Sequence, residues 1–385
     1  MDKNLKLMFV AGEDSGDAHA ARLVKAIRDE AGAVVDLFGC AGPRMRGEGV
    51  EPVVNADELA IIGLPEITCA LPMFLRTFRR LKDAAIERRP DAVILVDFPE
   101  FNLKLARSLH RAGLKVIYYI SPQLWGWRGY RKKTIRKDVD LLLTILPFEK
   151  QWYAERGILN VEYVGNPLVN EVAATETKEQ TRERYDIGGN DPLIALLPGS
   201  RQKEVARILP RMFDAAELIS AARPDVRFIA AAANERRASQ IREITANRHR
   251  MLPIEIAIND TYNVVAASDA AAVTSGTATL ETGLLLTPLV VVYAASSLNY
   301  RLIRPFVSSP HFGLINLIAE KRIAKELIQG DLTPEALASE LARLLEPDTN
   351  NKARNELSKA SAKLGPGGAS ERAAKLIIDL IKRGG

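Results

Sequence analysis

Asp97 follows directly on a strongly apolar run, AVILV at 92–96. Such a run is typical of a strand buried on both faces of a parallel sheet, and α/β proteins bind ligands in the loops after these strands. A carboxylate in this position can act as a general base on a hydroxyl group. The alternative is a cap for a helix that we expect to begin near Glu100. The sequence favours the catalytic role and leaves the cap open.

A more acidic loop, GEDSGD at 12–17, follows the first apolar run, LKLMFVA at 5–11. Its two glycines permit close approach of the backbone to a ligand. Its three carboxylates would repel a phosphate, and the pattern is neither GxGxxG nor a P-loop. We therefore predict a loop that binds the hydroxyl groups of a polar substrate. The alternative is that Ser15 or Asp17 caps the following helix.

Two tryptophans and a basic cluster meet in SPQLWGWR at 121–128, and six Lys or Arg without an acid lie within 128–137. An aromatic face beside positive charge suits an acyl or sugar group that carries a phosphate. Nucleic acid would need more extensive interleaving of basic and aromatic residues. The alternative is a loop that anchors the core. The residues for which we predict acceptor binding are Gln123, Trp125, Trp127 and Arg128.

Two further loops, LPGSR at 197–201 and SGTATLE at 275–281, follow apolar runs in the second half of the chain. Backbone N–H groups and the positive end of a helix dipole make a helix start suitable for a pyrophosphate, and Arg201 adds a full charge. Glu204 lies one turn into the first of these helices, and we expect it to be among the residues that bind the UDP. Glu281 is placed to accept hydrogen bonds from a ribose diol, although Thr277 and Glu281 are also near the spacing of a capping box.

Metal chemistry is not expected. Asp138-Val139-Asp140 matches a DxD motif, but it precedes its strand, and we interpret it as a solvated turn. The four histidines show no ligand spacing, and no nucleophile elbow is visible. Cys40 and Cys69 offer neither a disulfide framework nor a zinc site, which indicates a reducing compartment. We predict no metal and no cofactor.

The composition excludes disorder, since 47% of the residues are hydrophobic and 26% charged. The amino terminus resembles neither a signal nor a transit peptide. The uncharged stretch 282–300 contains Pro288, so we expect a helix end, a turn and a strand in place of a membrane span. The net charge of +5 is modest, and the local basic patches fit phosphate, anionic lipid or nucleic acid.

Expected strands and helices, which must hold these loops in place, alternate along all 385 residues. Apolar runs separated by stretches long enough for crossover helices predict parallel sheets, so we expect an α/β protein with two Rossmann-like domains facing a cleft. A donor in one domain and an acceptor in the other is the layout of a transferase. The expected strands are 5–11, 34–38, 92–96, 115–120, 140–146, 161–164, 193–197, 226–232, 270–273 and 289–293. The expected domains are an acceptor domain at 1–167, a linker at 168–190, a donor domain at 191–365 and a C-terminal helix at 366–385.

In this order and at these intervals, the motifs resemble the lipid-A-disaccharide synthase family of glycosyltransferases over almost the whole chain. Any one segment alone is a weak signal, whereas the series is specific. The segments that carry the resemblance are AGEDSGD at 11–17, GCAGPRM at 39–45, VDFPEFN at 96–102, ISPQLWGWR at 120–128, LPFEK at 146–150, LLPGSR at 196–201 with Glu204, SGTATLE at 275–281, and LINL at 314–317 with Glu326 and Gln329.

The resemblance implies the GT-B fold, with a last helix that returns to the first domain or passes to a partner chain. It implies a metal-independent condensation of UDP-2,3-diacylglucosamine with 2,3-diacylglucosamine-1-phosphate through a β-1′,6 bond, which releases UDP. Asp97 matches the family's proposed base, and Arg201 would stabilise charge on the leaving UDP. The carbohydrate-binding loop falls on Glu13, Ser15, Gly16 and Asp17. The nucleotide contacts fall on Gly199, Ser200, Arg201, Ser275, Gly276, Thr277, Thr279 and Glu281, and Asn316 matches a further polar position.

Both sugars of that reaction carry acyl chains, so an enzyme of this family must work at a lipid surface. The apolar strip Phe74, Leu75 and Phe78, beside Arg79 and Arg80, suits an anionic inner leaflet. We therefore expect a cytoplasmic protein, peripheral on the inner membrane, and a homodimer is compatible with the sequence. The alternative for this segment is a core helix with a solvated basic face.

Two other functions stay open at this point. Another GT-B enzyme that uses UDP-N-acetylglucosamine, an epimerase or a lipid-linked-sugar transferase, would not explain the loops at 12–17 and 121–128 together. A basic nucleic-acid-binding protein is compatible with the pI of about 9.1. No RNA or DNA motif is recognisable, however, and we expect no nucleic-acid partner.

Overall fold

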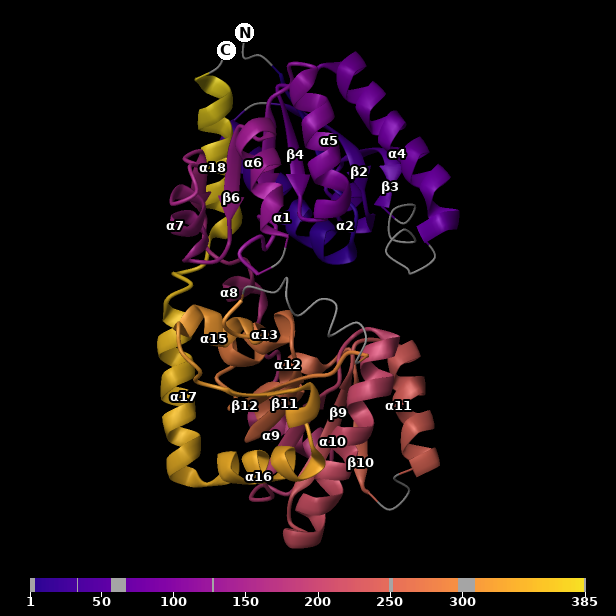
Figure 1. The fold of residues 1–385 in the computed structure, drawn as a ribbon, viewed down its shortest axis with the longest axis vertical. Coiled ribbons are helices and arrows are strands. Elements are labelled where there is room, and N and C mark those ends of the chain that lie inside the picture. The colour runs from indigo at the N-terminus through magenta and orange to yellow at the C-terminus, as the bar shows by residue number, and fades with distance from the viewer. Residues whose placement is uncertain are drawn as a thin grey trace. The chain divides into compact units, whose positions relative to one another are not determined.

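The computed structural model describes residues 4–32, 34–56, 67–126, 128–248, 252–296 and 309–383. The chain divides into two compact units (Figure 1). The first unit comprises Met1–Pro167 and Pro366–Gly385, and the second comprises Leu168–Gly365. Trp127, for which the sequence predicts acceptor binding, lies outside the described residues.

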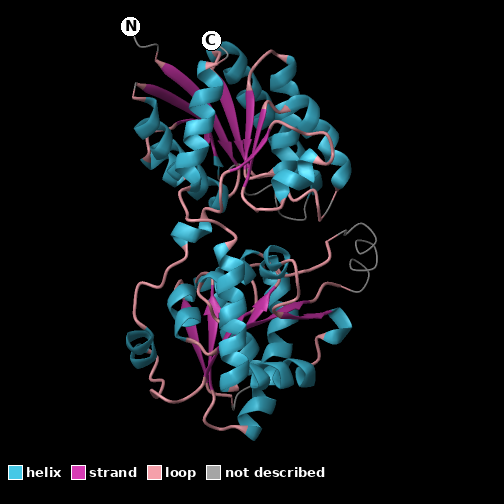
Figure 2. Cartoon of the chain, turned by 90° about the vertical axis from the view of Figure 1, so that its left-hand side faces the viewer, coloured by secondary structure: helices cyan, strands magenta, loops and turns pink. Residues whose placement is uncertain are grey.

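The first unit is built on a seven-stranded parallel sheet with the order β3-β2-β1-β4-β5-β6-β7, and helices cover both of its faces (Figure 2). Its strands are β1 (Leu5–Ala11), β2 (Val35–Ala41), β3 (Glu51–Asn55), β4 (Ala92–Val96), β5 (Val116–Tyr119), β6 (Leu141–Thr144) and β7 (Val161–Tyr163). Its helices are α1 (Asp14–Ala31), α2 (Pro43–Gly47), α4 (Ile67–Arg88), α5 (Pro99–Arg111), α6 (Lys132–Asp138), α7 (Glu149–Ala154), α18 (Ala369–Lys382) and the 3₁₀ turn η2 (Gly129–Arg131).

The central strands are apolar throughout because both of their faces are covered. Leu7 and Phe9 of β1 pack in a core with α1 and α18, whereas Met8 and Val10 point to the opposite core, with α4 and α5. The C-terminal helix α18 packs on α1. The predicted return of the last helix to the first part of the fold is therefore made within this chain.

The second unit has a six-stranded parallel sheet with the order β10-β9-β8-β11-β12-β13. Its strands are β8 (Leu193–Leu197), β9 (Arg227–Ala232), β10 (Ile254–Ile258), β11 (Ala270–Thr274), β12 (Leu289–Tyr293) and β13 (Lys325–Ile328). Its helices are α8 (Leu168–Glu171), α9 (Lys178–Arg184), α10 (Gln202–Ala222), α11 (Glu235–Arg248), α12 (Thr261–Ala267), α13 (Thr277–Leu284), α15 (Leu314–Ala319), α16 (Pro334–Leu345), α17 (Pro347–Ala362) and the 3₁₀ turn η4 (Gln329–Asp331).

The segment 168–190, expected to be a linker, contains α8 and α9 and belongs to the second unit. Arg182 on α9 is buried, and its guanidinium donates to the carbonyls of Ala267 and Gly188 at 3.3 and 3.0 Å. A buried guanidinium with bonds of this kind fixes the segment to the unit. The polar, charged composition therefore marked a pair of surface helices and not a free linker.

Sequence patterns missed three strands, β3, β10 and β13, and all three lie at sheet edges. An edge strand is only partly covered, so its residues do not form the continuous apolar run that reveals a central strand. The uncharged stretch is confirmed over its described part, because α13 ends at Leu284 and β12 begins at Leu289. Among the described helices, none combines the length and apolar character that crossing a bilayer requires.

Candidate active site

The two acidic loops of the first unit lie side by side because β1 and β4 are neighbours in the sheet. The chain order reverses here, with β2 on one side of β1 and β4 on the other, and such switch points bind ligands in open α/β sheets. Ala11 at the end of β1 pairs with Val96 at the end of β4. Gly12 packs on Phe98 so closely that a Cβ would lie 2.6 Å from its ring. The fold thus joins the GEDSGD loop to the loop after β4.

Asp97 has an unusual backbone that its neighbours hold in place. Asp97 and Phe98 are both left-handed, with φ of 47° and 46°, a conformation that costs non-glycine residues of the order of 1 kcal/mol. The Asp97 carbonyl accepts hydrogen bonds from Asn102 Nδ2 at 2.8 Å and from the Tyr118 hydroxyl at 2.6 Å. The N-cap of α5 is Phe98, so the capping alternative for Asp97 is wrong.

The Asp97 side chain has the electrostatics of a base that works near neutral pH. Burial and, to a smaller degree, the nearby charge of Glu13 raise the pKa of its carboxyl group to about 6. A hydrogen bond from the Phe98 backbone and the proximity of His19 oppose the rise. The group is therefore mostly ionised at pH 7 and able to accept a proton.

Asp17 in the acidic loop has a supporting position. It is 1% exposed, and its carboxylate accepts hydrogen bonds from the backbone N–H groups of Gly42, Arg44 and Met45 at 2.8, 2.8 and 3.2 Å. These are the first amides of α2, whose N-terminus has no side-chain cap of its own. Asp17 thus fixes the GCAGPRM segment, and the predicted acceptor contact is better assigned to its neighbours.

The exposed part of this loop is Glu13, Asp14 and Ser15. Gly16 is buried, and a Cβ there would lie 3.6 Å from Ala11. The helix begins at Asp14, and neither Ser15 nor Asp17 caps it, so the capping alternative for this loop is wrong as well.

Glu149 organises the tryptophan loop from within the core. One of its oxygens accepts hydrogen bonds from the Ser121 hydroxyl at 2.8 Å and the Trp125 indole at 3.1 Å. The other accepts from the backbone N–H groups of Ile145 and Leu146 at 3.2 and 3.0 Å. Burial raises the pKa of Glu149 to about 7, and these bonds oppose the rise. Trp125 is 9% exposed, so its position is that of a core anchor, the alternative that the sequence left open.

Gln123 and Arg128 are the other described members of the predicted acceptor group. Gln123 is exposed. Arg128 forms an ion pair with Glu100 at the start of α5, and Arg131 binds the second oxygen of the same carboxylate at 2.6 Å. Glu100 thus ties the beginning of the basic cluster to the helix that follows Asp97.

The glycine loops of the second unit are also brought together at a switch point. β8 lies between β9 and β11, so the loops after β8 and β11 emerge next to each other. Gly199 has a φ of 105° and Gly276 a φ of 146°, conformations that glycine adopts without a steric penalty. Ser200, Arg201 and Thr277 are exposed there. Adjacent helix starts with an exposed guanidinium beside them suit an anionic ligand.

The hydroxyl groups of Ser275 and Thr279 are used within the protein. Ser275 donates to the Phe312 carbonyl at 2.6 Å. Thr279 donates to the Gly276 carbonyl at 2.8 Å and accepts from the Leu314 N–H at 3.0 Å. They hold the loop's shape, and the surface that faces solvent is formed by Gly276 and Thr277.

Asn316 is 0% exposed, and its amide group is fully used. Its nitrogen donates to Ala324 O and Glu326 Oε1 at 2.8 and 2.9 Å, and its oxygen accepts from the N–H groups of Ile323 and Ala324 at 3.0 and 2.9 Å. Glu326 also accepts from the Gly313 N–H at 2.9 Å. The predicted ligand contact of Asn316 is therefore corrected to a supporting role behind the loop.

Two acids flank the glycine loops. Glu204 accepts a 3.2 Å hydrogen bond from the Arg201 side chain and closes a capping box with the Arg201 backbone. Glu281 accepts from the Tyr262 hydroxyl at 3.0 Å, and burial raises its pKa. No residue that the structure describes donates a hydrogen bond to the second oxygen of Glu281, so this oxygen can accept from a diol.

A family model described as Lipid-A-disaccharide synthetase matches residues 7–378 of this sequence. The chain belongs to this family. The lipid-A-disaccharide synthase of Syntrophus aciditrophicus is 42% identical to it over 99% of each chain, and that of Myxococcus xanthus is 40% identical over 98% of each. The resemblance inferred from the motifs is confirmed, and the protein is a glycosyltransferase of lipid A biosynthesis.

Solved structures share the fold of this synthase family at low sequence identity. MnaA of S. aureus in complex with UDP aligns with a TM-score of 0.71 at 14% identity and covers 98% of this chain and 97% of its own. The calicheamicin glycosyltransferase CalG4 aligns with a TM-score of 0.61 at 15% identity over 99% of both chains. The predicted α/β fold of the GT-B type is confirmed.

Four residues of the synthase were missed as parts of the site, namely Asn102, Tyr118, Glu149 and Glu326. Asn102 stands in VDFPEFN and Glu149 in LPFEK, two of the motifs used above. The spacing of a motif marks a residue as special but does not tell a ligand contact from a buried brace. Their burial and hydrogen bonds make that distinction.

Two of the three apolar side chains predicted to contact the membrane pack against the core instead. Phe74 and Phe78 on α4 pack edge-on against Phe101, with ring centroids 5.0 and 5.9 Å apart, and Leu81 is fully buried. The alternative of a core helix with a solvated basic face fits this packing. Leu75, Arg79 and Arg80 are exposed, although Arg80 also donates to the Val53 carbonyl.

We interpreted the DxD sequence as a solvated turn, and the structure shows that this interpretation is wrong. Asp138 is 1% exposed at the end of α6, and Asp140 accepts a 2.7 Å hydrogen bond from the Val116 N–H. Within the described residues, no group of three or more His, Cys, Asp or Glu side chains is arranged to hold a metal ion.

Proposed function

We propose that the enzyme joins UDP-2,3-diacylglucosamine to the 6-hydroxyl of 2,3-diacylglucosamine-1-phosphate, which forms a β-1′,6 bond and releases UDP. The family membership supports this reaction. The first unit would hold the acceptor and the second unit the UDP-sugar. The observation that carries the proposal is the ionisable Asp97 carboxylate, held in a left-handed backbone at a switch point with its pKa raised to about 6.

Asp97 is the general base of this mechanism. As the acceptor oxygen attacks the anomeric carbon of the donor, its proton passes to the Asp97 carboxylate. The bond between that carbon and the UDP oxygen breaks with its electron pair on UDP, so the anomeric configuration is inverted. The raised pKa fits the role, because a base is most useful when its pKa lies near the working pH.

The acceptor sugar would be bound by the exposed groups around Asp97. Glu13 and Ser15 are suited to its hydroxyl groups, and the buried Gly16 completes this loop behind them. Gln123 and Arg128 are suited to its polar and phosphate groups, with Arg128 oriented by Glu100. We keep Trp127 as a further acceptor contact.

The UDP of the donor would lie on the two glycine loops. The backbone N–H groups that follow Gly199 and Gly276 would bind the diphosphate, together with Ser200 and Thr277. Arg201, whose side chain is 83% exposed, would neutralise the charge that develops on UDP as it leaves. Glu281 would bind the ribose hydroxyls. Glu204 would hold Arg201 in position.

The acyl chains of both substrates support work at the cytoplasmic face of an anionic membrane. The exposed side chains of α4 that suit such a surface are Leu75 and Arg79. The contact would involve the outer face of this helix and not the rings of Phe74 and Phe78, which pack on Phe101.

The experiment that tests the proposal is a mass-spectrometric assay of the purified protein with both lipid substrates in detergent micelles. We expect a disaccharide phosphate and UDP. Asp97→Asn keeps the shape but removes the base, and should lower kcat by about 10²–10⁴-fold. Asp29→Asn, the same change on the exposed face of α1, is the control and should leave kcat unchanged. Near-normal turnover of the Asp97 variant would show that another group is the base.

A further inference from the structure

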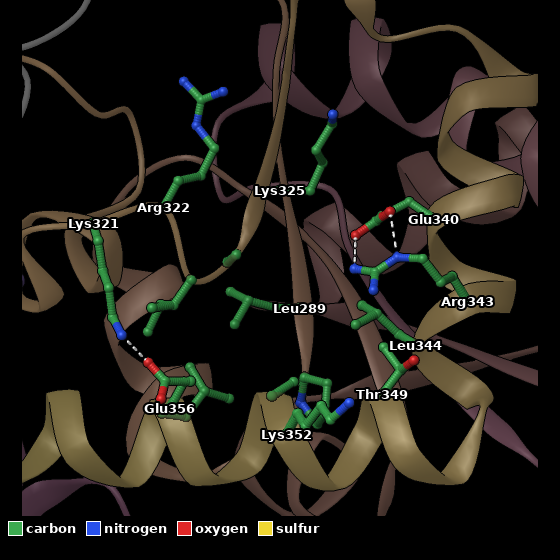
Figure 3. Close-up of a pocket in the computed structure, with 15 residues that line it drawn as sticks. Leu289, Lys321, Arg322, Lys325, Glu340, Arg343, Leu344, Thr349, Lys352 and Glu356 are labelled. Atoms are coloured by element: carbon green, nitrogen blue, oxygen red, sulfur yellow. Dashed lines mark hydrogen bonds and ion pairs between the residues drawn. The ribbon is translucent and has the colours of Figure 1, made fainter.

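A pocket of about 390 Å³ opens in the second unit at the beginnings of β12 and β13 (Figure 3). Its walls are Pro288 and Leu289, residues 321–325, the end of α16 and the first half of α17. The loops proposed for UDP follow the other ends of β8 and β11. Because all strands of this sheet are parallel, their beginnings and their ends lie on opposite sides of the sheet. The pocket is at the beginnings and the loops are at the ends, so the pocket is a separate feature.

The floor of the pocket is apolar and its rim is charged. Leu289, Leu344 and Leu357 at the floor are each at most 4% exposed. The rim has five basic and two acidic side chains, an excess of three positive charges. The charged residues are Lys321, Arg322, Lys325, Arg343, Lys352, Glu340 and Glu356.

Ion pairs account for both of the acids, and Glu356 also pairs with Lys359 of α17 at 2.9 Å. Lys321 pairs with Glu356 at one end of the pocket, and Arg343 binds Glu340 with two hydrogen bonds of 2.9 and 2.5 Å at the other (Figure 3). The Arg343 bonds use Nε and Nη2, so its Nη1 has no partner among the described residues. Each pair thus fixes a cation at the rim without filling the space between them.

Three cations remain without a counterion. The side-chain nitrogens of Arg322, Lys325 and Lys352 have no ion pair or hydrogen bond with any residue that the structure describes. Lys352 comes from α17, whereas Arg322 and Lys325 extend from the other side of the pocket (Figure 3). Like charges around one cavity repel each other, and an anion that enters it removes that repulsion.

We propose that this pocket binds a small phosphate-bearing anion. Its volume lies in the usual range of small-molecule sites. Guanidinium groups match phosphate oxygens in pairs, and lysines add point charges. An excess of three positive charges fits a ligand with two or more phosphate charges. A free phosphorylated metabolite and the phosphate headgroup of an anionic lipid both present this chemistry.

The test is a calorimetric titration of the full chain with inorganic pyrophosphate, in the presence of excess UDP to occupy the proposed donor loops. A triple variant, Arg322→Gln, Lys325→Gln and Lys352→Gln, removes the free cations. We expect it to bind roughly tenfold more weakly than the native protein, or worse. The matched control is Lys25→Gln, Arg236→Gln and Lys375→Gln, which removes the same charge from exposed positions on α1, α11 and α18 and should bind as the native protein does.

A second arm measures sedimentation of the three proteins with phosphatidylcholine vesicles that contain phosphatidylglycerol. Pyrophosphate binding that needs the three cations identifies a free anion as the ligand. Vesicle binding alone with the same dependence identifies a lipid headgroup. If the native protein binds neither probe, or if the pocket variant binds as the control does, the proposal is overturned. Because the two triple variants are compared in one buffer, this outcome is independent of the proposed donor site.

Discussion

The switch points of the two units have the same topology and opposite chemistry. At β1 and β4 the loops carry carboxylates, and the left-handed positions are the non-glycine residues Asp97 and Phe98. At β8 and β11 the left-handed positions are Gly199 and Gly276, and the exposed charge is Arg201. One place in the sheet therefore holds a constrained acid in the first unit and glycine-led helix starts beside an exposed arginine in the second.

The difference shows how one architecture serves two tasks. A base must point in one direction, so the first unit accepts backbone strain and fixes it with hydrogen bonds from Asn102 and Tyr118. A diphosphate needs several N–H donors at short range, and glycine gives access to them without strain. The fold provides the location of each site, and a few side chains decide its charge.

After the loss expected for the Asp97 variant, the largest expected effect is on the positive side of this comparison. Arg201→Ala removes the charge beside the proposed leaving group, so kcat/KM should fall about 10²-fold and UDP should bind more weakly. Steady-state kinetics and calorimetry measure both effects. Lys203→Ala, on the same helix and exposed, is the control. Activity of the Arg201 variant within twofold of the control would remove Arg201 from the mechanism.

In the first unit, the position of the tryptophan loop depends on the buried Glu149. Glu149→Gln puts an NH₂ group where an oxygen accepts two hydrogen bonds, so the free energy of unfolding should fall by about 2 kcal/mol. Urea denaturation measures the change. Glu155→Gln, an exposed position in the same segment, should change it by less than about 0.5 kcal/mol. Equal stability of the two variants would mean that Glu149 does not anchor the tryptophan loop.

The pH dependence separates the two sites further. With a pKa of about 6 for Asp97, kcat should fall as the pH drops below 6, because the protonated acid cannot accept a proton. Glu13 raises this pKa, so Glu13→Gln should move the acidic limb of the profile of kcat against pH to lower pH. Glu30→Gln, at the exposed end of α1, should leave it in place. If the acidic limb does not move in the Glu13 variant, the charge of Glu13 does not raise the pKa of Asp97.

The smallest effect concerns the backbone of Asp97. Tyr118→Phe removes one of the two bonds to its carbonyl, so unfolding should become easier by about 1 kcal/mol and kcat should fall several-fold. Tyr153→Phe, a buried tyrosine that also donates to a carbonyl, measures the stability cost alone. If both variants lose stability but keep the native kcat, the Asn102 bond is sufficient to position Asp97.

Much of the fold could be predicted because central parallel strands have a strong signal. Each of the ten apolar runs expected to be strands overlaps a strand of the structure. The edge strands β3, β10 and β13 were missed, because partial exposure mixes polar residues such as Glu51, Glu255 and Lys325 into them. The loops of the candidate site were located by the same runs, since each loop follows the end of a strand.

The sequence by itself determined the family, the two parallel sheets and the loops where polar residues gather. Only the tertiary structure decided which of those residues face solvent. Asp17, Trp125 and Asn316 look like ligand contacts in the sequence, yet all three are buried and hydrogen-bonded to the segments that shape the loops. A polar residue beside a site is needed either to bind a ligand or to satisfy buried donors and acceptors. Both needs select the same residue types, and only the contacts in space separate them.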